Sequence, residues 1–152
     1  MTPVPVPGHQ AIMNLVGIYA ERLDAGDFAG AAELFAHATI TSEGYDRNTS
    51  GADAVREMFE TWTRRYEDNG TPHTKHVTTN LVIDVDDQAG TGTCRSYVTV
   101  FQATDRLPLQ PVFAGRYHDR FERADGTWRF SHRHMITDYV GDLSHHLLQP
   151  IG

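Results

Sequence analysis

The sequence predicts an α+β fold in which three N-terminal helices pack on one face of a curved, mainly antiparallel sheet. In the first part of the chain, apolar residues recur at helical spacing. After Gly70, β-branched and aromatic residues dominate, and turn clusters separate the segments. Helices followed by an antiparallel meander are typical of α+β folds.

The chain opens with an extended arm and one long helix. Residues 1–9 alternate proline and valine, without the apolar stretch of a signal peptide. From Gln10 onward, one helical face carries an apolar stripe. It consists of Ile12, Leu15, Val16, Tyr19 and Leu23. Gly26 ends this first helix.

Two shorter helices and a short strand follow. Asp27 is suited to cap a second helix over residues 28–35. A third helix is predicted after Ser50, because an apolar stripe runs from Val55 to Tyr66 and ends before Gly70. Between these two helices, residues 39–43 are long enough for one strand.

Four long strands are predicted over residues 74–85, 91–103, 112–123 and 128–139. Asp125-Gly126, between the last two, is a strong hairpin signal. On the third strand an aromatic face with Tyr117 should meet the core, and a charged face with His118 should meet water or a partner. The tail from Gly141 carries three leucines and should dock as a short helix or form an interface.

Composition excludes several classes of protein. The 152 residues fit one domain, and 13 Lys and Arg against 20 Asp and Glu leave a net charge of −7, which argues against nucleic-acid binding. The single Cys94 excludes an internal disulfide framework and a multi-thiolate zinc site. Without a signal peptide or an apolar stretch of about 18 residues, we expect a cytoplasmic protein with no membrane partner.

Several short segments, in this order, resemble the SnoaL-like group of the NTF2-like superfamily, whose fold is also called cystatin-like. They are Leu-Asp-Ala-Gly-Asp-Phe at 23–28, Thr-Ser-Glu-Gly at 41–44, His-Val-Thr-Thr-Asn-Leu at 76–81, and the stretches 115–123 and 125–133. The resemblance covers residues 10–148 and implies a cone in which helices close over the sheet. The substrate stays open, because this fold serves cyclases, dehydratases, isomerases, hydrolases and non-catalytic subunits.

The resemblance also implies a catalytic set. Two eliminating enzymes of this superfamily, scytalone dehydratase and hexachlorocyclohexane dehydrochlorinase, use an Asp–His pair in the cone. The aspartate falls on Asp24 and the histidine on His76, while the pocket arginine of the dehydrochlorinase falls on Arg133. Its pocket lysine is Tyr19 here and its strand tryptophan is Ile40, so its chlorinated substrate does not carry over.

These residue types suit proton transfer next to a carbonyl. An imidazole removes the proton, and a carboxylate on its other ring nitrogen fixes the tautomer. An arginine in an apolar cone binds an enolate or carboxylate oxygen. The resemblance implies a pocket lined by the substrate-binding residues Tyr19, Ile40, Tyr45, Cys94, Ser96, Phe113, Tyr117, Met135 and Thr137.

Plainer roles stay open for each catalytic candidate. Asp24 can be a solvated helix end, and Arg133 a surface cation paired with an acid. Strand alternation places His76 opposite the more apolar face, so an inward His76 requires a bulge or a covered second face of the sheet. His73 and His76 alone offer too few ligands for a metal, and the other histidines are scattered. We expect no metal and no cofactor.

The favoured hypothesis is a cofactor-independent enzyme that acts on a small, largely apolar, carbonyl-bearing compound. Its reaction would be an elimination or dehydration, an isomerisation, or a polyketide-type cyclisation, which places it among lyases or isomerases. The alternative is a non-catalytic ligand-binding or assembly subunit, similar to the small subunit of ring-hydroxylating dioxygenases. The sheet's second face favours a homodimer, with a trimer as the other candidate.

Overall fold

The computed structural model describes residues 5–150, so positions 1–4 of the expected arm lie outside it. Its helices are α1 (Gly8–Asp24), α2 (Phe28–Glu33) and α3 (Ala52–Trp62). α1 begins two residues before the predicted start. Asp27 caps α2 as predicted, by accepting a hydrogen bond from the backbone N–H of Gly30 at 2.8 Å. The expected continuation of the third helix to Tyr66 is wrong, because Thr63 has extended backbone angles.

Six strands form one sheet in the order β2-β1-β6-β5-β4-β3. β1 pairs parallel with β6, and the other neighbours pair antiparallel. The strands are β1 (Thr39–Ser42), β2 (Tyr45–Ser50), β3 (Thr74–Asp86), β4 (Thr91–Thr104), β5 (Leu107–Ala124) and β6 (Thr127–Val140). β2 is absent from the sequence prediction, because its side chains are mostly exposed and show no apolar alternation.

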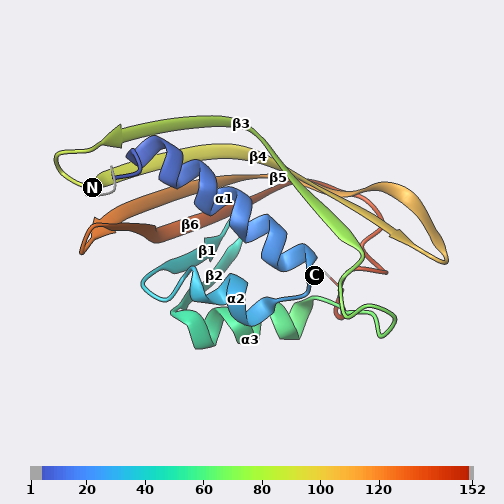
Figure 1. The fold of residues 1–152 in the computed structure, drawn as a ribbon. Helices are drawn as coiled ribbons and strands as arrows, with labels where there is room; N and C mark the ends of the chain where they lie inside the picture. The colour runs from blue at the N-terminus through green and yellow to red at the C-terminus, as the bar shows by residue number, and fades with distance from the viewer. Residues whose placement is uncertain (1–4, 151–152) are drawn as a thin grey trace.

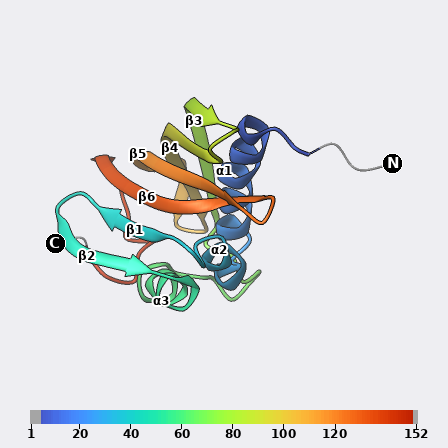
Figure 2. The same cartoon turned by 90° about the vertical axis from the view of Figure 1, so that its left-hand side faces the viewer.

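The sheet curls around the three helices, which all lie on its inner face (Figures 1 and 2). α1 runs across β3 and buries its apolar stripe there, with Ile12 and Val16 almost inaccessible to water. Tyr117 of β5 belongs to the core, whereas His118 is exposed, as the alternation predicted. The α+β fold with helices on one face of a mainly antiparallel sheet is therefore confirmed.

A β-bulge in β3 decides which way His76 faces. Asn80 adopts a left-handed backbone conformation with φ 57°, and the pairing with β4 shifts between Thr79 and Val82. Because of the extra residue, His76 before the bulge and Leu81 after it both turn toward the inner face. The bulge is one of the two conditions under which an inward His76 was expected.

The C-terminal segment, residues 141–150, docks without forming a helix, so the expected docking helix is wrong. Leu147 forms a β-bridge with Thr63, just after α3. The carbonyl oxygen of His145 accepts hydrogen bonds from Tyr66 and Gln102. The segment thus closes one end of the cone. No helix in residues 5–150 is long and apolar enough to cross a membrane.

Candidate active site

Asp24 and His76 form a close pair between the end of α1 and the start of β3. His76 Nδ1 lies 2.6 Å from Asp24 Oδ1. The backbone N–H of His76 donates to the other carboxylate oxygen at 2.8 Å, and the Thr74 hydroxyl donates to Oδ1 at 2.9 Å. Both side chains of the pair are about nine-tenths buried. Asp24 is therefore not a solvated helix end.

The charge of Asp24 fixes the tautomer of His76. Burial acts to raise the pKa of Asp24, but the hydrogen bonds and charge of His76, with Thr74, bring it below its usual value of 3.8. The ionised carboxylate can only accept hydrogen bonds, so Nδ1 of His76 carries the proton. The other ring nitrogen, Nε2, has no hydrogen-bond partner among residues 5–150.

The pair lies in the wall of a hollow of about 480 Å³ between α1 and the edge strand β3. Small residues of α1 line one side, and Lys75 and Thr78 flank His76 on the other. The full lining is Gly17, Ala20, Glu21, Asp24, Ala25, Lys75, His76 and Thr78. A small molecule in this hollow can reach the histidine.

A second histidine, His146, lies next to the pair and was missed by sequence reasoning. Burial, followed by the charge of His76, lowers the pKa of His146 to about 4, and Asp24 opposes this effect. Its Nδ1 is buried without a hydrogen-bond partner in the described chain. His146 is therefore neutral at neutral pH. No sequence signal distinguishes it, because its position depends on the docking of Leu147 on Thr63.

Arg133 lies at the centre of the core, so the surface position left open for it is wrong. Its side chain is 0% exposed and makes a two-pronged ion pair with Asp119, with both N–H···O distances at 2.8 Å. Its guanidinium lies 3.7 Å from the ring centre of Tyr117 and 4.3 Å from that of Tyr19. Asp119 therefore accepts hydrogen bonds from Nε and Nη2, and the two rings cover the guanidinium. Of its nitrogen atoms, only Nη1 lacks a hydrogen-bond partner within residues 5–150.

The structure places Arg133 apart from the Asp24–His76 pair. His76 pairs with Val100 on β4, whereas Asp119 pairs with Cys94, six residues earlier on the same strand. At about 3.3 Å per residue, the backbones of the two rows are about 20 Å apart along an extended strand, although the long Arg133 side chain reaches the ring of Tyr19 on α1, five residues before Asp24. Within the described residues, no hydrogen bond or ion pair joins Arg133 to either member of the pair.

Most of the expected pocket-lining residues lie on the core side of the sheet. The buried ones are Tyr19, Ile40, Cys94, Ser96 and Tyr117, while Phe113 and Met135 are partly buried and pack against the core. Tyr45 and Thr137 are exposed, because they lie at the edge hairpin and near the end of β6. None of the nine lines the hollow beside His76.

Buried hydroxyl and thiol groups on the inner face remain protonated. Burial raises the pKa of Tyr19 and, more strongly, that of Tyr117, so both phenols can donate hydrogen bonds. Burial also raises the pKa of the Cys94 thiol to about 11, which makes it a poor nucleophile. In residues 5–150, no three His, Cys, Asp or Glu side chains are grouped to hold a metal ion.

Comparison with known proteins identifies the family and the fold. The family of SnoaL-like domains matches residues 7–134 of the chain. No protein of curated function matches the sequence significantly. An NTF2-like protein with a cystatin-like fold from Novosphingobium aromaticivorans is 17% identical, with a TM-score of 0.69 over 85% of this chain and 80% of that one. The expected NTF2-like, cystatin-like fold is confirmed.

Two further solved structures share this fold. A proposed scytalone dehydratase from Novosphingobium aromaticivorans is 25% identical, with a TM-score of 0.68 over 88% of this chain and 86% of that one. ActVI-ORFA from Streptomyces coelicolor is 19% identical, with a TM-score of 0.68 over 87% and 98%. An identity as low as that of ActVI-ORFA shows the fold alone.

Proposed function

Because the chain belongs to the family of SnoaL-like domains, we propose that it is a cofactor-independent enzyme in which His76, oriented by Asp24, removes a proton from a small carbonyl compound. The 2.6 Å contact between His76 Nδ1 and Asp24 Oδ1 carries this proposal. It leaves Nε2 as a free base next to a hollow that admits a small molecule.

In the proposed step, Nε2 of His76 accepts a proton from the carbon next to the carbonyl. The electrons of the broken C–H bond form an enolate, and Asp24 stabilises the imidazolium. Loss of a leaving group from the neighbouring carbon completes an elimination or dehydration. Reprotonation at another carbon gives an isomer, and attack on a second carbonyl gives a ring.

Two cations are candidates for holding the enolate oxygen. Lys75 lines the hollow beside His76, which supports it for a ligand bound there. Arg133, implied by the resemblance, keeps an unpartnered Nη1, but the rings of Tyr19 and Tyr117 are in edge-to-face contact beside it, so a ligand would reach it only if these rings moved apart. Small residues such as Gly17 and Ala20 in the wall support a small, largely apolar substrate.

We also propose that the protein self-associates and resides in a reducing compartment such as the cytoplasm. Val77, Thr99, Ala114 and Tyr139 pair in one line across four strands, and Val77 and Tyr139 are exposed apolar residues on it. The one cysteine, Cys94, is a buried thiol, which suits reducing conditions. The resemblance to a proposed scytalone dehydratase supports dehydration among the candidate reactions.

Nitrobenzisoxazole tests the proposal without knowledge of the substrate, because its ring opens to a coloured phenolate when a base removes one carbon-bound proton and the N–O bond breaks. We expect the wild type to accelerate this opening and His76→Gln to lose about 10²–10⁴-fold in kcat/KM. His37→Gln, at an exposed histidine, is the matched control and should retain the rate. A wild type no faster than His76→Gln would favour the non-catalytic binding subunit.

A further inference from the structure

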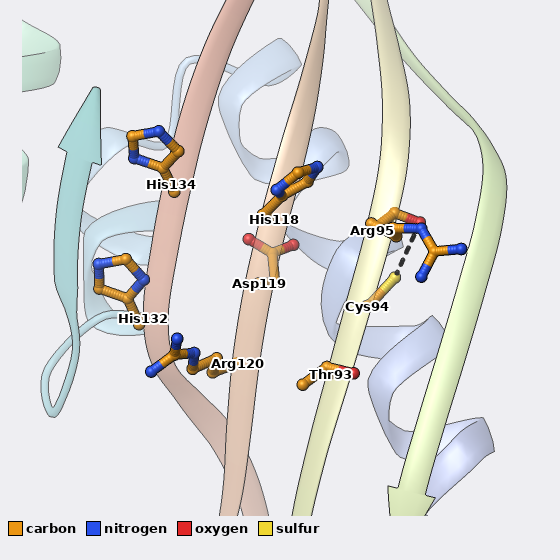
Figure 3. A pocket seen from close by; sticks show the side chains of 8 residues that line it. All are labelled: Thr93, Cys94, Arg95, His118, Asp119, Arg120, His132 and His134. Carbon is orange, nitrogen blue, oxygen red and sulfur yellow. Dashed lines mark hydrogen bonds between the residues drawn. The ribbon is translucent and has the colours of Figure 1, made fainter. Parts of the chain in front are cut away.

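The outer face of the sheet carries a compact patch of arginine and histidine side chains (Figure 3), and none of its residues lines the hollow beside His76. Two rows of paired residues cross β4, β5 and β6 there. One row is Arg95, His118 and His134, and the other is Thr93, Arg120 and His132. With about 4.8 Å between strands and about 6.7 Å between alternate residues, the patch measures about 10 by 7 Å.

The protein does not neutralise this patch itself. Arg95 and Arg120 make no ion pair and no side-chain hydrogen bond within residues 5–150. Asp119, between the rows in sequence, is fully buried on the inner face with Arg133. No acidic side chain lies directly opposite either arginine, because Arg95 faces Val82 and His118, and Arg120 faces Thr93 and His132.

The electrostatic surroundings of His132 agree with this reading. Burial lowers its pKa, and the charges of Arg120 and His134 lower it further, whereas Asp119 raises it only as the smallest of these effects. In a chain with a net charge of −7, two arginines without an ion-pair partner among residues 5–150 thus lie close together beside imidazoles that can donate N–H groups. Such a cluster is the usual electrostatic footprint of an anion site.

The patch is hollowed and its histidines are oriented. The hollow measures about 390 Å³ and is lined by these two rows with Cys94 and Asp119. The Thr41 hydroxyl on β1 lies 2.7 Å from His134 Nδ1 and 3.3 Å from His132 Nε2, which holds both rings toward the strands' outer side. Two arginines with planar N–H forks and imidazole N–H groups match the oxygens of phosphate or carboxylate groups.

We propose that this hollow is a binding site for a small polyanion that carries phosphate or carboxylate groups. The size of the patch fits two or three anionic groups on one small molecule, and an extended nucleic acid would need a longer basic track. Two arginines among the ligating groups disfavour a metal ion. The arginines and histidines of this site take no part in the proposed reaction.

Isothermal titration calorimetry with pyrophosphate and with citrate tests the site on the whole protein. We expect at least one of them to bind, and the Arg95→Met/Arg120→Met variant to weaken its Kd at least about tenfold. The stronger probe identifies phosphate or carboxylate as the preferred group. Arg106→Met, at an exposed arginine in the β4–β5 turn, is the matched control and should bind as the wild type does.

Two results would overturn the proposal. One is that neither probe binds to the wild type. If light scattering then shows that the double arginine variant changes the oligomeric state, the hollow is a contact between copies and not an anion site. The other is equal affinity of the double variant and the Arg106→Met control. Circular dichroism of the double variant establishes that it is folded.

Discussion

Two acid–base pairs lie on the inner face of the sheet, and they differ in their access to solvent. The Asp24–His76 pair borders a hollow and leaves one imidazole nitrogen free. The Asp119–Arg133 pair is fully enclosed by the core, with aromatic rings on the guanidinium. The first arrangement suits proton transfer, whereas the second fixes the positions of Tyr19 and Tyr117.

Removal of one partner of the enclosed pair should destabilise the protein strongly. Arg133→Met leaves the charge of Asp119 buried without a counter-ion, so we expect a loss of about 3–5 kcal/mol in the free energy of unfolding, measured in urea. Adding Asp119→Leu should recover part of this loss. Arg116→Met, which breaks the exposed pair with Asp138, should cost much less. Equal losses at both arginines would contradict this account.

At the scale of elements, the helices and long strands follow from local sequence patterns. The stripe from Ile12 to Leu23 matches α1, and three of the four long strands lie within one residue of the predicted ranges, whereas β5 begins at Leu107, five residues before its predicted start. The polar strand β2 and the end of α3 at Trp62 could not be predicted, because pairing with β1 and docking of the tail decide them.

The candidate site divides in the same way. Asp24 and His76 could be found from the resemblance alone, and the structure brings them into contact. The bulge at Asn80 allows His76 and the apolar residues after it to face the same side of the sheet. The sequence indicates that such a bulge could be needed for an inward His76, but not where it lies. His146 could not be found, because contacts between residues distant in sequence bring it to the pair.

The docked C-terminal segment should make stability depend on pH through His146. In the unfolded chain its pKa is near 6.5, and in the fold it is about 4. The folded form therefore takes up its proton only at lower pH, and stability present above pH 6.5 is lost as the pH falls toward 4. At about 1.4 kcal/mol for each pKa unit, the loss is about 3 kcal/mol.

Urea unfolding of the wild type and His146→Phe between these pH values measures this effect. Phenylalanine cannot take up a proton, so the variant should lose less stability on acidification than the wild type. His37→Phe replaces an exposed histidine and should follow the wild type. Parallel pH curves for the wild type and His146→Phe would show that the C-terminal histidine is not held neutral in the fold.

At the scale of the whole molecule, the outer face of the sheet has two halves with different properties. The cationic hollow occupies one half, and exposed apolar residues such as Val77, Tyr97 and Tyr139 occupy the other. Apolar surface that continues across strands is typical of protein contacts. A second copy can therefore cover the apolar half while the hollow stays open to solvent.

Size-exclusion chromatography with light scattering tests this self-association. We expect a dimer for the wild type and a shift toward monomer for Tyr139→Glu, which places a charge on a residue that is 77% exposed in the single chain. Tyr45→Glu, at the exposed start of β2, is the matched control and should remain a dimer. If the wild type is a trimer and Tyr139→Glu dissociates it, the surface around Tyr139 is still the contact between copies, and only the number of copies differs. A monomeric wild type would contradict the proposal.

The most direct test of the central claim is a double-mutant cycle on the Asp24–His76 pair. The quantity measured is kcat/KM for nitrobenzisoxazole opening in the wild type, Asp24→Asn, His76→Gln and the double variant. If the two side chains act as one base, the double variant should lose no more than His76→Gln alone, because Asp24 works only through the histidine. Losses that multiply, or no loss in either single variant, would contradict the assignment of Asp24 and His76 as a general base.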